Sequence, residues 1–245
     1  MFQTGKGFVP DEIVPDSEVF ILMQNPGHEE EQQGKPAVGK TGQQMDSQFL
    51  PLAGLERGKD VSVGNILRCR WADTNELPPE DILSDAVTHC TREHLLLPGK
   101  TRLVVAQGAL AFNTISQGKY KKSNGKAATI SDYRGFVLPD TLKGVPVYAC
   151  LHIAGLDRQQ GKGKKKGGLT PAQRWVAQHV DWPKIKKVLN GEIPQALPRR
   201  LLVTESNVAE WTEWFDTAQQ SRYVVCDTEF TRDSKYLTLL GLLQV

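Results

Sequence analysis

The sequence predicts an α/β fold with three layers, in which helices cover both faces of a central, mostly parallel sheet. Between residues 18 and 189, short apolar runs of strand length alternate with segments of helical spacing. Hydrophobic residues make up 39% of the 245 residues and charged residues 24%, which suits a chain with a buried core. No apolar run reaches the roughly 18 residues that a membrane span needs.

Five apolar runs are expected to be strands and four segments are expected to be helices. The strands are predicted at 18–23, 61–67, 102–106, 133–138 and 145–151. The helices are predicted at 42–55, 79–97, 109–115 and 171–189, with polar loops at 28–41 and 117–132. Pro171, directly after Thr170, is typical of the first position of a helix.

Charge and cysteine content restrict the setting of the protein. The net charge is +2, and four cysteines occur without a CxxC pair. This favours a reducing, cytoplasmic environment without a disulfide framework, and no contact with a membrane. Residues 158–190 carry nine Lys or Arg against one acid. Such a basic block is typical of a solvated loop, and less often of a surface that contacts phosphates.

Polar residues stand where three predicted strands end. Asn25 follows the first strand within Met23-Gln24-Asn25-Pro26-Gly27, Asn65 ends the second, and His152 ends the last. In open parallel sheets, ligands bind beyond the carboxyl ends of the strands. Each residue also has a structural interpretation, as a turn former, a satisfied amide or a structural histidine. Their convergence at one sheet edge favours a functional site.

One motif suggests a different chemistry. Residues 34–41 match the phosphate-binding pattern G-x-x-x-x-G-K-[ST], ending at Lys40-Thr41. A true phosphate loop needs a strand that runs directly into its first glycine. Here residues 28–33, with three glutamates, separate the first strand from Gly34. Nucleotide hydrolysis is therefore a weak hypothesis, and the motifs described next support two stronger ones.

The same strand-end residues, in this order, resemble the uracil-DNA glycosylase superfamily, above all its iron–sulfur branch. The motifs that carry the resemblance are M-Q-N-P-G at 23–27, G-K-P-A-V-G at 34–39, V-G-N-I-L-R-C-R at 63–70 and L-H-I-A at 151–154. They match G-E-A-P-G, G-x-P-F-V-G, N-V-V-K-C-R and H-P-S of that branch. The resemblance covers residues 5 to about 190.

The resemblance implies a role for each residue in hydrolysis of an N-glycosidic bond. Asn65 would bind the edge of an extruded uracil, because an amide offers one donor and one acceptor. His152 would donate to the uracil oxygen that becomes negative. Gln24 stands where the branch has its Glu, and Asn25 matches the Asn of other branches. We expect Asn25 to hold the attacking water, and Pro26 and Gly27 to line the pocket.

Several positions depart from the family pattern. Ala37 replaces the Phe that stacks on uracil, and Leu156 is a weak candidate for the residue that fills the vacated stack. Lys162, Lys164, Lys165 and Lys166 replace part of a final loop and are expected to contact phosphates. Only Cys69 and Cys90 match the four cluster ligands, since the first pair would precede Met1. We therefore expect no iron–sulfur cluster and no other cofactor in this domain.

The carboxyl-terminal segment resembles the start of a ribonuclease D-like, polymerase I-type 3′→5′ exonuclease with a ribonuclease H-like fold. It carries D-T-E-F-T-R at 227–232 and L-G-L-L-Q at 240–244. In that family Asp227 and Glu229 would bind Mg²⁺ or Mn²⁺. The other carboxylates of the family come later, so we expect this truncated piece to be incompetent alone.

The sequence as a whole therefore predicts a DNA repair or replication protein. Residues 1–192 would form the glycosylase-like domain, 193–199 a linker and 200–245 the first part of the exonuclease. The partner would be uracil-containing DNA, single- or double-stranded, and the attached enzyme a DNA polymerase, a viral one included. The alternative is an inactive glycosylase fold that senses uracil or grips DNA.

Overall fold

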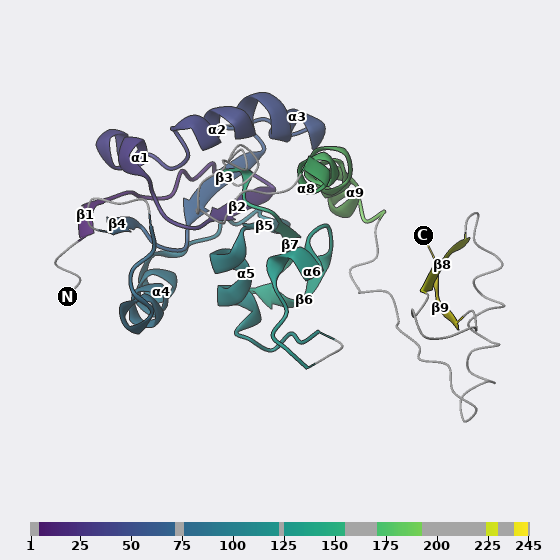
Figure 1. Ribbon diagram of the computed structural model, residues 1–245. Coiled ribbons are helices and arrows are strands. Elements are labelled where there is room, and N and C mark those ends of the chain that lie inside the picture. The colour runs from purple at the N-terminus through teal and green to yellow at the C-terminus, as the bar shows by residue number, and fades with distance from the viewer. Residues whose placement is uncertain are drawn as a thin grey trace. The chain divides into compact units, whose positions relative to one another are not determined.

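The computed structural model describes residues 5–71, 76–122, 125–154, 171–192, 224–229 and 238–244. The chain divides into two units, residues 1–197 and 198–245, and each is described by itself. A five-stranded sheet in the order β3-β2-β5-β7-β6 forms the centre of the first unit (Figure 1). Its strands are β2 (Val19–Met23), β3 (Val61–Asn65), β5 (Leu103–Gln107), β6 (Val137–Leu142) and β7 (Val145–Cys150).

The sheet is mostly parallel, as the sequence predicts. The strand β2 pairs in parallel with β3 and β5, and β5 pairs in parallel with β7. The edge strand β6 is antiparallel to β7 and forms a hairpin with it. The carboxyl ends of β3, β2, β5 and β7 therefore meet at one edge, and their four following loops share that edge.

Helices cover both faces of the sheet (Figure 1). One face carries α2 (Lys40–Gln44), η1 (Met45–Phe49, a π-helical turn), α3 (Leu50–Leu52), α8 (Pro171–Val176), η2 (Ala177–Asp181, also π-helical) and α9 (Trp182–Leu189). The other face carries α4 (Glu80–His94), α5 (Ala109–Ser116) and α6 (Ile130–Tyr133). This is the predicted three-layer α/β architecture. None of the described helices is long and apolar enough to cross a membrane.

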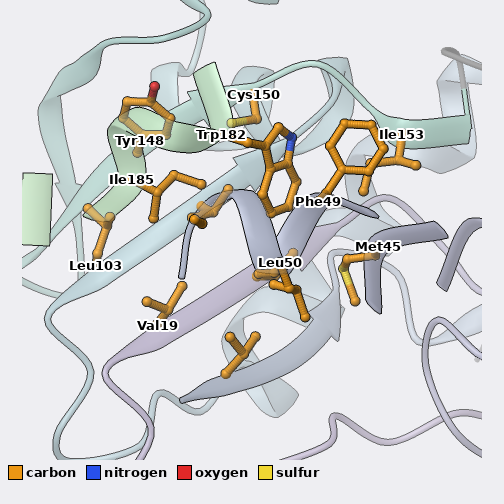
Figure 2. Packing of buried hydrophobic residues seen from close by; sticks show 14 of the residues in the cluster. Val19, Met45, Phe49, Leu50, Leu103, Tyr148, Cys150, Ile153, Trp182 and Ile185 are labelled. Atoms are coloured by element: carbon orange, nitrogen blue, oxygen red, sulfur yellow. The ribbon is translucent and has the colours of Figure 1, made fainter. Parts of the chain in front are cut away.

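The alternation of side chains along each strand divides the core into two clusters. In β2, Val19, Ile21 and Met23 point to one cluster, whereas Phe20 and Leu22 point to the other. Figure 2 shows the first cluster, where Trp182 of α9 packs on Phe49 with ring centroids 5.3 Å apart. Both faces of the strands are buried, which explains why their sequences are apolar without alternation.

Four local predictions were wrong, wholly or in part. The strand predicted at 133–138 begins later, because Tyr133 belongs to α6 and β6 covers Val137–Leu142. The predicted loop 28–41 contains α1 (His28–Gln33), and the loop 117–132 contains the start of α6. The strand predicted at 61–67 ends at Asn65, and β4 (Cys69–Trp71) pairs instead with β1 (Gly5–Phe8) in a separate ribbon. The helix α1 has glutamates in its first turn and Gly34 in the left-handed region, with φ of 64°, at its end. Both features are ordinary helix-end signals.

In the second unit the structure describes two antiparallel strands, β8 (Val224–Glu229) and β9 (Thr238–Gln244). Asp227 pairs with Gly241 and Glu229 with Thr238, and the register shifts between Asp227 and Thr228. The two carboxylate-bearing residues therefore lie in the last half of β8. The side chains of this unit lie outside the described part of the chain.

Candidate functional site

The three residues that the sequence places at strand ends meet at the carboxyl edge of the sheet. Asn65 is the last residue of β3, Asn25 lies two residues after β2, and His152 lies two residues after β7. The strand before His152 is thus shorter than predicted. Since β3 neighbours β2 and only β5 separates β2 from β7, these loops are close neighbours.

Main-chain hydrogen bonds join the loop after β2 to the loop after β3. The amide of Ile66 donates to the carbonyl of Met23 over 2.9 Å, and the amide of Leu67 donates to that of Gln24 over 3.0 Å. These bonds extend the parallel ladder past the ends of both strands. They fix the backbone on either side of Asn65 and Asn25 without using either side chain.

Asn65 has a buried side chain that is 3% exposed. Within the described residues its carboxamide makes no hydrogen bond, and the Asp11 carboxylate lies directly against the preceding residue, Gly64. Asp11 in turn pairs with Arg68 over 2.6 Å, and both are nearly inaccessible. Burial raises the pKa of Asp11, while the Arg68 guanidinium opposes the rise. A rigid ion pair therefore lies against β3 next to Asn65, whose carboxamide stays available to a ligand.

The Asn25 side chain has a defined orientation. Its Nδ2 donates to the carbonyl of Pro26 over 3.1 Å. With the amino group held in this way, Oδ1 is the atom left to accept a hydrogen bond. The partly buried side chain can thus orient a water molecule through one of that water's protons. Gln24 is also partly buried.

The tautomer of His152 follows from its own loop. Nδ1 accepts a hydrogen bond from the amide of Ala154 over 3.2 Å, so the proton of the neutral ring is on Nε2. Gly108 lies directly against this ring, because a Cβ there would come within 3.0 Å of the His152 Cβ. The φ of Gly108 is 92°, which also favours glycine. The start of α5 therefore fixes the imidazole, with Nε2 as the donor.

Ala37 lies in the first core cluster and is 4% exposed. Its φ of 49° is unusual for a residue with a side chain. Arg57 stabilises this backbone by donating to the carbonyls of Ala37 over 2.7 Å and Pro36 over 2.6 Å. The same guanidinium pairs with Glu12 and Asp46. One partly buried arginine thus fixes the backbone at Pro36 and Ala37.

Replacing Arg57 by alanine is expected to lower the free energy of unfolding by about 2–3 kcal/mol, because two carboxylates and two carbonyls lose their partner. Arg57→Lys should recover little of this, since one ammonium cannot reach the same set of acceptors. Denaturant unfolding measures the change. The control is Arg92→Ala, which breaks an exposed pair with Glu93 and should cost under about 0.5 kcal/mol. Equal losses in both alanine variants would contradict this role of Arg57.

The motif at residues 34–41 has a helix after Lys40-Thr41 but lacks the preceding strand. Its amides are also occupied, since Val38 and Gly39 donate to Glu30 Oε1 over 3.1 and 2.9 Å. A carboxylate therefore sits where a phosphate loop would hold phosphate. Glu30 Oε2 accepts from the amide of Gly27 over 3.0 Å, so this glutamate links the loop after β2 to the start of α2.

The chain is therefore expected not to hydrolyse ATP, because Glu30 occupies and repels the phosphate position. Lys40→Ala should leave the protein's response to added ATP and Mg²⁺ unchanged, as followed by phosphate release and by thermal shift. Stabilisation of the wild type by ATP that is lost in Lys40→Ala would revive the nucleotide-hydrolase hypothesis.

Cys69 and Cys90 lie close enough for their charges to interact. Burial raises the pKa of the Cys69 thiol, and Cys90 and Glu31 raise it further. Within the described residues no group of three or more His, Cys, Asp or Glu is placed to hold a metal ion. An iron–sulfur cluster needs more than two thiol ligands. No step of the chemistry proposed below depends on such a cluster.

Some predicted site residues lie outside the described part of the chain. These are Leu156, Lys162, Lys164, Lys165 and Lys166, while Asp227 and Glu229 are described for their backbone only. Their roles stay predictions.

Three residues of the site were missed by the sequence analysis. Glu30 appears in the sequence analysis only among the glutamates that separate the first strand from Gly34, and Arg57 belongs to no motif. Gln107 ends β5 at the same edge as Asn65, and it directly follows the apolar run at 102–106 that was predicted as a strand. Its signal was available, because a polar residue directly after such a run and directly before Gly108 marks a strand end.

Comparison with known proteins identifies the family. The model of the uracil DNA glycosylase superfamily matches residues 10–209. A type-4 uracil-DNA glycosylase of Sulfurisphaera tokodaii is 31% identical over 157 residues, 63% of this chain and 67% of that protein. Similar enzymes of Saccharolobus solfataricus (28%; 53% of this chain and 56% of that protein) and Pyrobaculum aerophilum (26%; 60% and 70%) also match. With the geometry above, these matches show that the chain belongs to the uracil DNA glycosylase superfamily.

Proposed function

We propose that the first unit is a uracil-DNA glycosylase, which binds an extruded uracil and hydrolyses its N-glycosidic bond. One observation carries the proposal. Asn25, Asn65 and His152 lie at the carboxyl edge of the sheet, after the neighbouring strands β2 and β3 and after β7, and main-chain bonds join the loops that follow β2 and β3. The family and its type-4 relatives support the reaction class.

Asn65 binds the base in this proposal. Its amide would accept from uracil N3–H and donate to O4, and cytosine presents the opposite pattern. The side chain has no hydrogen-bond partner among the described residues and its backbone is fixed by pairing with β2, so little has to be rearranged for it to bind. Preorganised polar groups of this kind discriminate well between bases.

His152 stabilises the leaving group. Cleavage of the glycosidic bond leaves negative charge on the uracil ring, shared with its O2 oxygen. The Nε2–H of His152 donates to that oxygen as the charge develops, while Ala154 keeps the ring in the required tautomer. Hydrogen bonds aimed at developing charge are commonly the largest catalytic contribution.

Asn25 positions the attacking water. Its Oδ1 accepts a hydrogen bond from a water that approaches C1′, and Nδ2 stays bound to Pro26. Neither Asn25 nor Gln24 can take up the water's proton, so the water attacks C1′ once the glycosidic bond is largely broken, and its proton passes to the released uracil anion or to solvent. This enzyme should therefore turn over more slowly than a glycosylase with a carboxylate at this position.

The test is incubation of excess protein with uracil-containing single- and double-stranded oligonucleotides, followed by alkali to break abasic sites. Strand breaks at uracil, with none in a thymine control, are the expected result. Intact strands at enzyme excess would contradict the proposed hydrolysis.

A second candidate is a module that binds uracil without cutting. Gln24 and Ala37 favour it, since the first lacks a carboxylate and the second lacks the ring that would stack on the base. A binding preference for uracil-DNA with no abasic product would support this function. Equal affinity for all DNA, with a steep salt dependence, would indicate only a phosphate grip, to which the lysines of 162–166 would contribute.

For residues 200–245 we propose the first part of a 3′→5′ exonuclease, joined through a linker at 193–199 to the glycosylase domain at 1–192. Its support is the D-T-E-F motif and the placement of Asp227 and Glu229 in the last half of β8. They would bind Mg²⁺ or Mn²⁺. The reading frame after Val245 tests this, because further exonuclease carboxylates and a polymerase should follow. A frame without them would contradict the proposal.

A further inference from the structure

Gln107 is a buried polar residue for which the packing of the domain gives no reason. It is the last residue of β5, and its side chain is 0% exposed. Neither Oε1 nor Nε2 has a hydrogen-bond partner in the described part of the chain. An unpaired buried carboxamide is destabilising, and such groups are rare in folded proteins. An apolar residue of similar size would remove this penalty, as in the four apolar residues before it in β5.

The side chain of Gln107 lies on the same face of the sheet as that of Asn65. In β5, Leu103 and Val105 point into the first core cluster, and by alternation Gln107 points the same way. In β3, Val61 and Val63 belong to that cluster, so Asn65 follows them. Both residues are the last of their strands, which places two buried carboxamides in one row along the carboxyl edge.

The register of the sheet gives their separation. Met23 pairs with Asn65, Leu22 pairs with Ala106, and Gln107 pairs with Cys150. Asn65 and Gln107 are therefore separated by the single strand β2, about 10 Å apart. The buried side chain of Met23 lies between them in this row, so a pyrimidine that binds both carboxamides would lie beyond the strand ends, over Met23. Gln107 lies on the side of β2 that leads to His152.

Gln107 is also joined to the His152 loop. The amide of the next residue, Gly108, donates to the carbonyl of Cys150 over 2.9 Å, and Gly108 lies against the imidazole. The position that would receive the O2 edge of the base is therefore next to Gln107 as well as to His152.

We propose that Gln107 is a base-binding residue of the proposed glycosylase pocket. Its carboxamide Nε2 donates to uracil O2, the carbonyl oxygen on the other side of N3 from the O4 that Asn65 binds. The inference rests on the proposed base binding of this site. Asn65, Ala37 and Gln107 are almost inaccessible without a ligand, so entry of the base must move packed side chains apart. The hydrogen bond to the base then satisfies the buried carboxamide of Gln107.

The test separates this role from a structural one by measuring stability and binding in the same variants. Gln107→Met keeps the length of the side chain and removes its polar atoms, and Gln107→Leu is the second variant. Both should raise Tm, by about 2–4 °C, because the unpaired amide is gone. Both should weaken binding of an oligonucleotide with a non-hydrolysable 2′-fluoro-deoxyuridine, by about tenfold to a hundredfold. Affinity for an oligonucleotide that carries an abasic analogue in place of the modified deoxyuridine should not change.

Val105→Ala is the matched control, because Val105 lies on the same strand and face and is fully buried. It should lower Tm and leave the preference for uracil over the abasic analogue intact. A wild type that prefers uracil, together with Gln107 variants that bind it equally well, would overturn the role of Gln107. So would loss of uracil affinity that only accompanies a lower Tm. A wild type without any preference for uracil would instead overturn the proposed base binding on which the inference rests.

Discussion

Replacement of His152 by alanine is expected to slow uracil release by about 10²–10³-fold, because the leaving base loses its hydrogen-bond donor. Single-turnover cleavage of a uracil-containing oligonucleotide measures the rate. Binding of the abasic product should change little, since the imidazole acts on the base as its charge develops. His152→Gln, which retains an N–H donor of similar reach, should restore part of the rate.

The control for this experiment is His89→Ala. His89 is an exposed histidine on α4, a helix that covers the opposite face of the sheet from the first core cluster. The His89→Ala variant should cleave at the wild-type rate. A His152→Ala variant with normal stability and an undiminished rate would show that the leaving group is stabilised by another residue.

Replacement of Asn25 by aspartate is expected to raise the rate of cleavage by about a hundredfold, because a carboxylate can accept the proton of the attacking water. The variant should also acquire an acid limb in its pH profile near the ordinary aspartate pKa of about 4, which the wild type lacks. Asn25→Ala, in contrast, should lose the water site and most of the activity.

A matched variant decides which residue lies nearer to the water. Gln24→Glu places a carboxylate one residue earlier, where the iron–sulfur branch has its Glu. The orientation of Asn25, with Nδ2 on Pro26, predicts the larger gain for Asn25→Asp. A gain for Gln24→Glu alone would move the water to Gln24. An unchanged rate in both variants, with normal folding, would contradict a rate-limiting water attack in this pocket.

The proposed site combines a fixed backbone with polar side chains that lack hydrogen-bond partners among the described residues. This combination would let it bind a base without a large rearrangement of the backbone. Arg57, Glu30 and the pair of Asp11 with Arg68 each fix backbone at the sheet edge. The amides of Asn65 and Gln107, in contrast, have no partners among the described residues. Stability is thus concentrated in the support of the site, while the groups proposed to bind the base are left for the ligand.

The sequence by itself determined the α/β class, because β2, β5 and β7 are apolar on both faces and alternate with helices. It also placed Asn25 and Asn65 at strand ends, since an apolar run that stops at a polar residue marks that end in any sheet of this class. It did not find α1, although its glutamates and Gly34 are signals, because a glycine-rich polar segment was interpreted as a loop.

Only the tertiary structure decided which polar residues lie together at the carboxyl edge of the sheet. Glu30 accepts from three amides that are up to nine residues away, and Arg57 reaches carbonyls about twenty residues away. Such contacts depend on the packing of loops and leave no periodic pattern in a sequence. The side of the sheet to which Gln107 points depends on strand order and register, and so does the lack of a partner for its carboxamide among the described residues. These arise from pairing between distant segments, so the sequence of β5 alone could not specify them.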